Sequence, residues 1–163
     1  MPNEVYNYIR IITTNEELIN LFTNNPFIPE TFFQAPEPTG LPLLEWRRNM
    51  FGTERFFSND GGSRSPVLRY VNAHITGYFQ TSWAPPIGLY QSLSDKYPDI
   101  QIYYEYNDYY MGFCGYGSAP GELTRFDWTR PDELATIKQS HSWHMAPWDP
   151  HFDYQAAEAH VRT

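Results

Sequence analysis

Three histidines close to the C-terminal end are the side chains in this sequence best suited to metal chemistry. His141, His144 and His151 stand with Asp149 in the stretch HSWHMAPWDPHFD. Imidazole and carboxylate groups bind zinc, and a His-x-x-His spacing can place two rings on one side of a helix. Two prolines interrupt that helix, and histidines near a chain end are usually solvated. A metal-dependent hydrolase is therefore one hypothesis, but we expect no bound metal or other cofactor and assign no catalytic residue.

A second candidate site is the stretch between Arg47 and Arg69, which contains five arginines, two acids and no lysine. Its net charge is +3 in a chain of net charge −8, so the remainder of the chain carries −11. Arginine binds phosphate and carboxylate groups through a planar fork and stacks on aromatic rings. We expect an anion-accepting edge for a nucleotide-like ligand or an acidic loop of a partner. The expected residues are Trp46, Arg47, Arg48, Arg55 and Trp83. Alternatively, these arginines only pair with acids of the same chain.

The single cysteine, Cys114, is expected to be a buried apolar side chain. No helix N-terminus or neighbouring cation in the sequence would lower its pKa, and one cysteine cannot form an internal disulfide. The glycine-rich stretch 112–121 lacks the Lys-Ser/Thr pair of a phosphate-binding loop.

Composition excludes several classes of protein. The acidic net charge disfavours non-specific binding to DNA or to anionic lipid. No apolar run is long enough to span a membrane, and the first residues do not resemble a signal peptide, so we expect a cytoplasmic protein. Aromatic residues make up 18% of the chain, so some of them, such as Tyr103, Tyr110 and Trp148, should be exposed, as is typical of binding surfaces. The sequence does not predict an oligomeric state.

The order of predicted elements begins with a strand over residues 4–14, rich in β-branched and aromatic side chains. A helix follows, with Thr14 as its N-cap. Residues 26–42 hold five prolines and predict an ordered excursion that is neither a regular helix nor a central strand. A short helix is expected over 43–51.

The second half of the chain predicts a strand region over 68–83, broken near Asn72. Prolines then begin a helix, because proline fits the first helical turn. We expect Trp83 to stand at this corner and to cover the edge of the core. Strands over 100–106 and 109–117 should form a hairpin with a two-residue turn at Asn107-Asp108. A further strand (122–128), a helix (130–139) and a last helix near 153–161 complete the prediction.

This order predicts an α+β fold with a ferredoxin-like, antiparallel-rich sheet, two main helices on one face and an irregular aromatic C-terminal segment. Three stretches resemble the YubB-type ferredoxin-like domain family of small plasmid and phage proteins: the opening Met1-Pro2-Asn3, TSWAPP at 81–86, and IYYEYNDYYMGFCG at 102–115. A fourth, FGTERF at 51–56, departs from that family's pattern. The length of 163 residues predicts a single domain. The resemblance implies a core at about 1–117 and an addition at about 118–163.

The resemblance implies an origin on a mobile genetic element but no mechanism. The leading hypothesis is a non-enzymatic accessory protein that engages a host protein, with counter-defence as one form of that role. The alternatives are a sponge for a nucleotide-like signalling molecule at the arginine and aromatic edge, and the metal-dependent hydrolase.

Overall fold

The computed structural model describes residues 3–36, 41–58, 64–149, 151–154 and 156–157. Within them the chain forms one antiparallel sheet, and the first four of its five helices pack on one face. The strands are β1 (Glu4–Ile12), β2 (Phe56–Ser58), β3 (Arg69–Val71), β4 (His74–Ser82), β5 (Gln101–Asp108), β6 (Phe113–Ala119) and β7 (Leu123–Asp127). The helices are α1 (Glu16–Thr23), α2 (Pro29–Phe32), α3 (Leu41–Phe51), α4 (Ile87–Lys96) and α5 (Pro131–Ser140).

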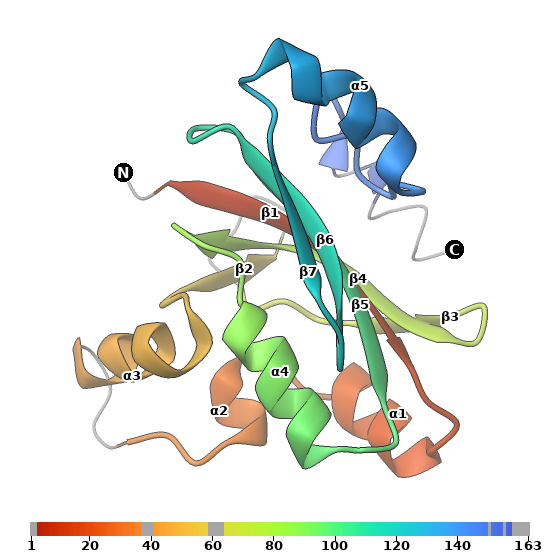
Figure 1. The fold of residues 1–163 in the computed structure, drawn as a ribbon. Coiled ribbons are helices and arrows are strands. Elements are labelled where there is room, and N and C mark those ends of the chain that lie inside the picture. Colours follow the sequence, from red (N-terminus) through yellow and green to blue (C-terminus); the bar gives the residue numbers. More distant parts are fainter. Residues whose placement is uncertain (1–2, 37–40, 59–63, 150, 155, 158–163) are drawn as a thin grey trace.

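The strand order is β2-β4-β1-β5-β6-β7, with β3 also paired to β4 (Figure 1). Every pairing between neighbouring strands is antiparallel. Taken in chain order, β1, the helices α1 to α3, β2, β4, α4 and β5 form the βαββαβ unit of a ferredoxin-like fold. The strands β6 and β7 and the helix α5 extend that unit at one edge, so the predicted fold class is confirmed.

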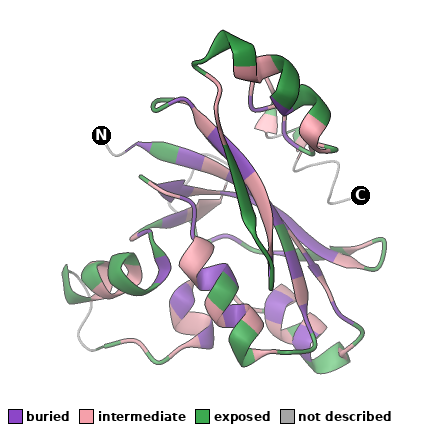
Figure 2. Cartoon of the chain, in the orientation of Figure 1, coloured by how far each residue is buried: buried purple, intermediate pink, exposed green. Residues whose placement is uncertain are grey.

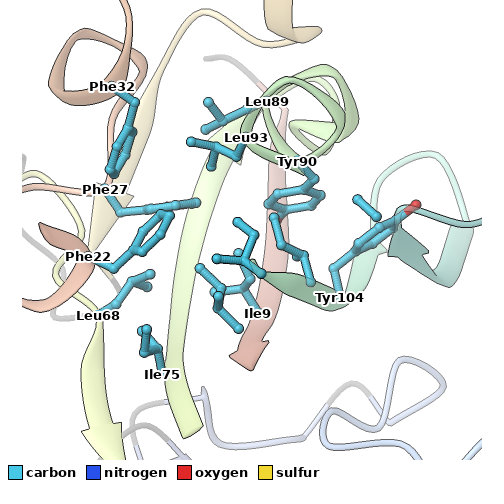
Figure 3. Packing of buried hydrophobic residues seen from close by; sticks show 14 of the residues in the cluster. Ile9, Phe22, Phe27, Phe32, Leu68, Ile75, Leu89, Tyr90, Leu93 and Tyr104 are labelled. Carbon is cyan, nitrogen blue, oxygen red and sulfur yellow. The ribbon is translucent and has the colours of Figure 1, made fainter. Parts of the chain in front are cut away.

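The main core lies between the sheet and the helices α1 to α4 (Figure 3). Because successive strand residues point to opposite faces, Ile9 and Ile11 of β1 face these helices together with Ile75 of β4. Phe22 and Leu93 close the core from α1 and α4. The described part of the Pro-rich excursion is ordered as expected. It contains α2, and its Phe27 and Phe32 are buried in this core. Residues 37–40 lie outside the described residues.

One predicted helix cap and one predicted turn were wrong. The N-cap of α1 is Asn15 and not Thr14. The side-chain oxygen of Asn15 accepts hydrogen bonds from the backbone N–H groups of Glu17 and Leu18. The helix therefore begins one residue later than predicted.

The predicted two-residue turn is also absent, because β5 continues through Asp108 and residues 109–112 form the turn. Asn107 and Asp108 are buried, and their side chains bind other parts of the chain. Asp108 accepts from Asn3, and Asn107 bonds Trp128.

The face of the sheet opposite the helices is covered by the C-terminal segment, residues 141–157, of which 150 and 155 are not described. Tyr8, Tyr78 and Met145 are buried in this second cluster, and Phe152 and Tyr154 pack against it. By contrast, α5 and β7 are exposed along most of their length (Figure 2). The last predicted helix, near 153–161, falls mostly outside the described residues. No helix in the described ranges is long and apolar enough to cross a membrane.

Candidate ligand-binding pocket on the sheet

Two cross-strand rows of side chains on the face opposite the helices form the candidate site. Residues directly opposite each other in antiparallel strands share a face and lie close together. The first row, which we call the covered row, consists of Tyr78, Tyr8, Glu105 and Tyr116. The second row, which we call the open row, consists of Arg69, Thr76, Arg10, Tyr103 and Ser118.

Glu105 in the covered row holds the C-terminal segment against the sheet. Its side chain is only 2% exposed. The carboxylate accepts from the backbone N–H of His144 at 2.8 Å and of Met145 at 2.9 Å. The Nε2–H of the His141 ring donates to Oε1 at 2.9 Å. Charge-assisted bonds of this kind are stronger than neutral ones, so Glu105 anchors the segment where it begins to cross the sheet.

The two histidine rings lie on the tyrosines of the covered row. His144 stacks on Tyr8 with the ring centroids 4.3 Å apart, and His141 stacks on Tyr116 at 4.2 Å. Burial lowers the pKa of His144; Glu105 acts in the opposite direction, while Arg10 and His141 lower the pKa further. Burial also raises the pKa of Tyr8 to about 12. The covered row is thus closed by two stacked histidine–tyrosine pairs around one anchored carboxylate.

A cavity of about 320 Å³ opens where this cover ends. A volume of this order is at the small end of the range for small-molecule sites. Its walls are mostly aromatic and come from both rows and from the edge of the C-terminal segment. Among its lining residues are Tyr8, Arg10, Tyr103, Tyr116, Ser118, Glu122, His141 and His144.

Arg10 brings the positive charge into this cavity. Its guanidinium lies over the Tyr103 ring at 5.0 Å from the centroid. Its Nε is buried and has no hydrogen-bond partner among the described residues. A buried donor is nearly always bonded, and leaving one unpaired costs about 1–3 kcal/mol. Arg10 therefore contains an unused, buried donor in the wall of the pocket.

Thr76 is the neighbour of Arg10 on β4 and shows the same feature. The residue is only 7% exposed, and its Oγ1 has no hydrogen-bond partner in the described structure. Arg69 on β3 is the next member of the open row and is exposed. Two strand spacings separate Arg69 from Arg10, about 10 Å. The open row thus contains two cations with a free hydroxyl between them.

The structure disperses the four residues considered for a metal. His141 bonds Glu105, His144 stacks on Tyr8, and the Asp149 carboxylate accepts from the backbone N–H of His151. Within the described residues, no three His, Cys, Asp or Glu side chains come together as a metal site.

The expected arginine and tryptophan edge divides into two parts. Trp46 packs on Phe51 at the margin of the core. Arg47 is mostly buried and donates to the Glu30 carboxylate and to the backbone oxygen of Glu54.

Arg48, Arg55 and Trp83 form the exposed part of the edge. Trp83 does not cover the core as expected: it is 60% exposed, because its φ of 70° turns the chain at the end of β4. The predicted binding role of these residues stays a prediction.

Cys114 is fully buried, as expected. Burial is the main cause that raises the pKa of its thiol to about 12, and Glu133 and Glu105 raise it further. The thiol therefore stays protonated and inert near neutral pH. Of the aromatics expected at the surface, Tyr103 and Tyr110 are exposed, whereas Trp148 is half-buried.

Arg10 and Glu105, two of the charged residues of this site, are not singled out in the sequence analysis. Both interrupt strands that are otherwise rich in apolar and aromatic residues. A charge on a strand covered on both faces requires a partner or a ligand. That signal was available in the sequence, but only the register of β1 against β5 brings the two residues together.

Residues 68–145, just under half of the chain, match the family model described as a ferredoxin-like domain in Api92-like protein. The match agrees with the observed topology and supports a ferredoxin-like domain. It extends from the start of β3 to Met145, so it includes Glu105 and His141 but not β1 and Arg10. No curated protein and no solved structure matches the chain.

Proposed function

We propose that this protein binds a nucleotide-like small molecule, with the base in the sheet pocket and an anionic group on the open row. One observation carries the proposal. Among the described residues, seven buried side-chain polar atoms lack a hydrogen-bond partner. One of them, Arg10 Nε, belongs to a residue in the wall of the cavity, and another, Thr76 Oγ1, is on the cross-strand neighbour of Arg10.

The anionic group is inferred from the donors of the open row. Arginine binds phosphate and carboxylate oxygens with charge-assisted hydrogen bonds. Arg10 Nε and the Thr76 hydroxyl would each gain the partner that they lack in the free protein. Arg69, at the exposed end of the row, adds a second positive charge on the same face.

The base is inferred from the walls of the cavity. Tyr103 and Tyr116 offer aromatic surface on which a planar ring can stack. Glu122 at the rim supplies an acceptor, and the Ser118 hydroxyl can donate or accept. A nucleobase carries both donors and acceptors on its edges, so it fits this mixture better than a purely apolar ring.

The charge of the chain favours a ligand with few phosphates. The net charge is −8, and Glu105 and Glu122 both line the cavity. Two arginines balance a monophosphate but not the larger charge of a triphosphate. We therefore expect nucleoside monophosphates, linear or cyclic, to bind more tightly than triphosphates.

A nucleotide panel tests this proposal. A ligand that binds only the folded state raises its thermal stability, so we expect at least one nucleoside monophosphate to raise the melting temperature more than its triphosphate. An Arg10→Gln variant should bind that monophosphate about tenfold more weakly, because a charge-assisted hydrogen bond contributes about 1.5 kcal/mol or more. Arg130→Gln is the matched control: Arg130 is the N-cap residue before α5, and its side chain is 65% exposed. The proposal would be refuted if no nucleotide raised the melting temperature, or if Arg10→Gln and Arg130→Gln weakened nucleotide binding equally.

A Thr76→Val variant should separate stability from binding. Valine has nearly the same shape but removes the unpaired buried hydroxyl, so the unliganded protein should become about 1 kcal/mol more stable. Loss of the hydroxyl should at the same time weaken monophosphate binding severalfold. Urea unfolding and isothermal titration calorimetry measure the two effects. If Thr76 only fills space between the strands, binding will not change.

The setting of this function rests on the sequence resemblance. We propose that the protein is a YubB-type accessory protein of a phage or plasmid that acts in the cytoplasm of the host cell. Holding a nucleotide-like signal without turning it over would suit a counter-defence role. Engagement of a host protein remains the second proposed activity, and the exposed part of the arginine edge, Arg48, Arg55 and Trp83, favours it.

A further inference from the structure

A second cavity, of about 310 Å³, lies at the corner where β4 ends, on the strand that leads into α4. It is separate from the sheet pocket and shares no lining residue with it. Its walls come from the end of α3, from the link between α3 and β2, and from the corner itself. The lining residues are Arg48, Gly52, Thr53, Glu54, Ser82 and Trp83.

Trp83 is held in an exposed and unfavourable position at this corner. Its φ of 70° lies in the left-handed region that non-glycine residues seldom adopt. Its backbone N–H is fixed by a 2.7 Å hydrogen bond to the Asn3 carbonyl. The indole is 60% exposed, and no hydrogen bond or ring contact from a described residue engages it. Backbone strain of this kind clusters at binding sites.

The charges around Trp83 leave one cation uncompensated. Arg48 and Arg55 lie 3.7 Å and 3.9 Å from the same carboxylate, that of Glu54, and both side chains are about half exposed. The hydroxyl of Ser82, in the wall of the cavity, is buried and has no hydrogen-bond partner among the described residues. The corner therefore presents a net positive charge next to an exposed indole.

We infer that this corner, which we call the Trp83 corner, is a docking site for a protein segment that carries an acidic residue next to an apolar one. The carboxylate would lie between Arg48 and Arg55, and the apolar side chain would pack on the indole. Tryptophan and arginine are the residues most enriched at the energetic centres of protein interfaces.

The open rim favours a protein over a small molecule. A small ligand usually has most of its surface buried by its site. Here Trp83 is 60% exposed, and the side chain of Arg48 is 59% exposed. A compact ligand bound at this corner would therefore remain largely in solvent. A protein surface can cover both side chains at once and exclude water around them.

Two matched peptides test the inference on the full chain. The first is acetyl-Gly-Asp-Phe-Gly-amide, and the second replaces Asp with Asn. We expect the Asp peptide to shift the NMR signal of the Trp83 indole N–H, assigned with a Trp83→Phe variant. The Asn peptide should bind about tenfold more weakly, because it loses the charge-assisted bonds.

The variants separate this site from the sheet pocket. Arg48→Gln and Arg55→Gln should each weaken binding of the Asp peptide severalfold and leave nucleotide binding unchanged. Arg69→Gln should weaken nucleotide binding and leave binding of the Asp peptide unchanged. Unchanged melting temperatures would show that the variants are folded. Equal binding of both peptides, or no shift of the Trp83 signal, would overturn the inference. Acetate or phosphate binding as tightly as the Asp peptide would also overturn it, because the corner would then be a site for free anions.

Discussion

A Glu105→Gln variant will be less stable than the parent protein by about 3 kcal/mol. Glu105 is almost fully buried, and its two oxygens accept from His141 Nε2 and from the backbone N–H groups of His144 and Met145. Glutamine keeps the shape but replaces one acceptor oxygen by an NH₂ group. That NH₂ would face donors, so at least one buried N–H would lose its partner and the remaining bonds would lose the assistance of the charge.

Urea unfolding measures this loss, since the transition midpoint falls with stability. Limited proteolysis adds a second readout. Cleavage within residues 141–149 should be much faster in the variant, because Glu105 fixes the start of the C-terminal segment. The control is Glu45→Gln, on the exposed side of α3. It should leave both the urea midpoint and the cleavage rate unchanged. A Glu105→Gln protein within about 0.5 kcal/mol of the parent would show that the segment is held by its aromatic packing alone.

A Gly88→Ala variant is expected to lose about 2 kcal/mol of stability, although alanine is the better helix former. Gly88 lies in the first turn of α4, where α4 contacts the end of α3. A Cβ at this position would lie 2.7 Å from the Met50 carbonyl oxygen and 2.9 Å from the Phe51 Cα. These are backbone atoms and cannot rotate away, so the two helices would have to separate and expose part of the core around Phe51.

Chemical denaturation of Gly88→Ala beside Gln91→Ala measures the effect. Gln91 is exposed on the same helix, and its replacement raises helix propensity without a new contact. We expect Gln91→Ala to be neutral or slightly stabilising. If Gly88→Ala and Gln91→Ala had the same free energy of unfolding, α3 and α4 would not approach each other as closely at Gly88 as described.

The fold could be predicted because its elements carry strong local signals. The alternation of β-branched and aromatic residues over 4–14 predicted β1 almost to its last residue. The prolines after Trp83 marked the start of α4. The turn at Asn107-Asp108 was mispredicted because both side chains are used by distant parts of the chain, Asn3 and Trp128 among them, and a local turn rule contains no such contacts.

The sheet pocket could not be predicted in the same way. It depends on register: Arg10 faces Tyr103 and Thr76 only because β1 pairs with β5 and β4 in one particular alignment. A shift of one residue would turn these side chains to the other face. The spacing of the histidines suggests metal chemistry, but the fold brings Glu105 beside His141 and His144, and these two side chains cover the sheet instead.

The exposed part of the arginine edge was partly visible in the sequence. The excess of arginine between 47 and 69 pointed to the right region of the chain. The structure adds that Arg47 is engaged by Glu30, whereas Arg48 and Arg55 share one carboxylate. Composition alone cannot separate the buried, paired Arg47 from the exposed Arg48 that follows it.

The central claim is that the open row and its cavity bind a nucleotide-like ligand. A crystal structure with the nucleoside monophosphate that gives the largest thermal shift tests it most directly. We predict that the base stacks over Tyr103 or Tyr116 and that a phosphate oxygen lies within hydrogen-bond distance of Arg10 Nε and Thr76 Oγ1. A nucleotide bound elsewhere on the chain, or a bound nucleotide that leaves both of these atoms without a partner, would contradict the account.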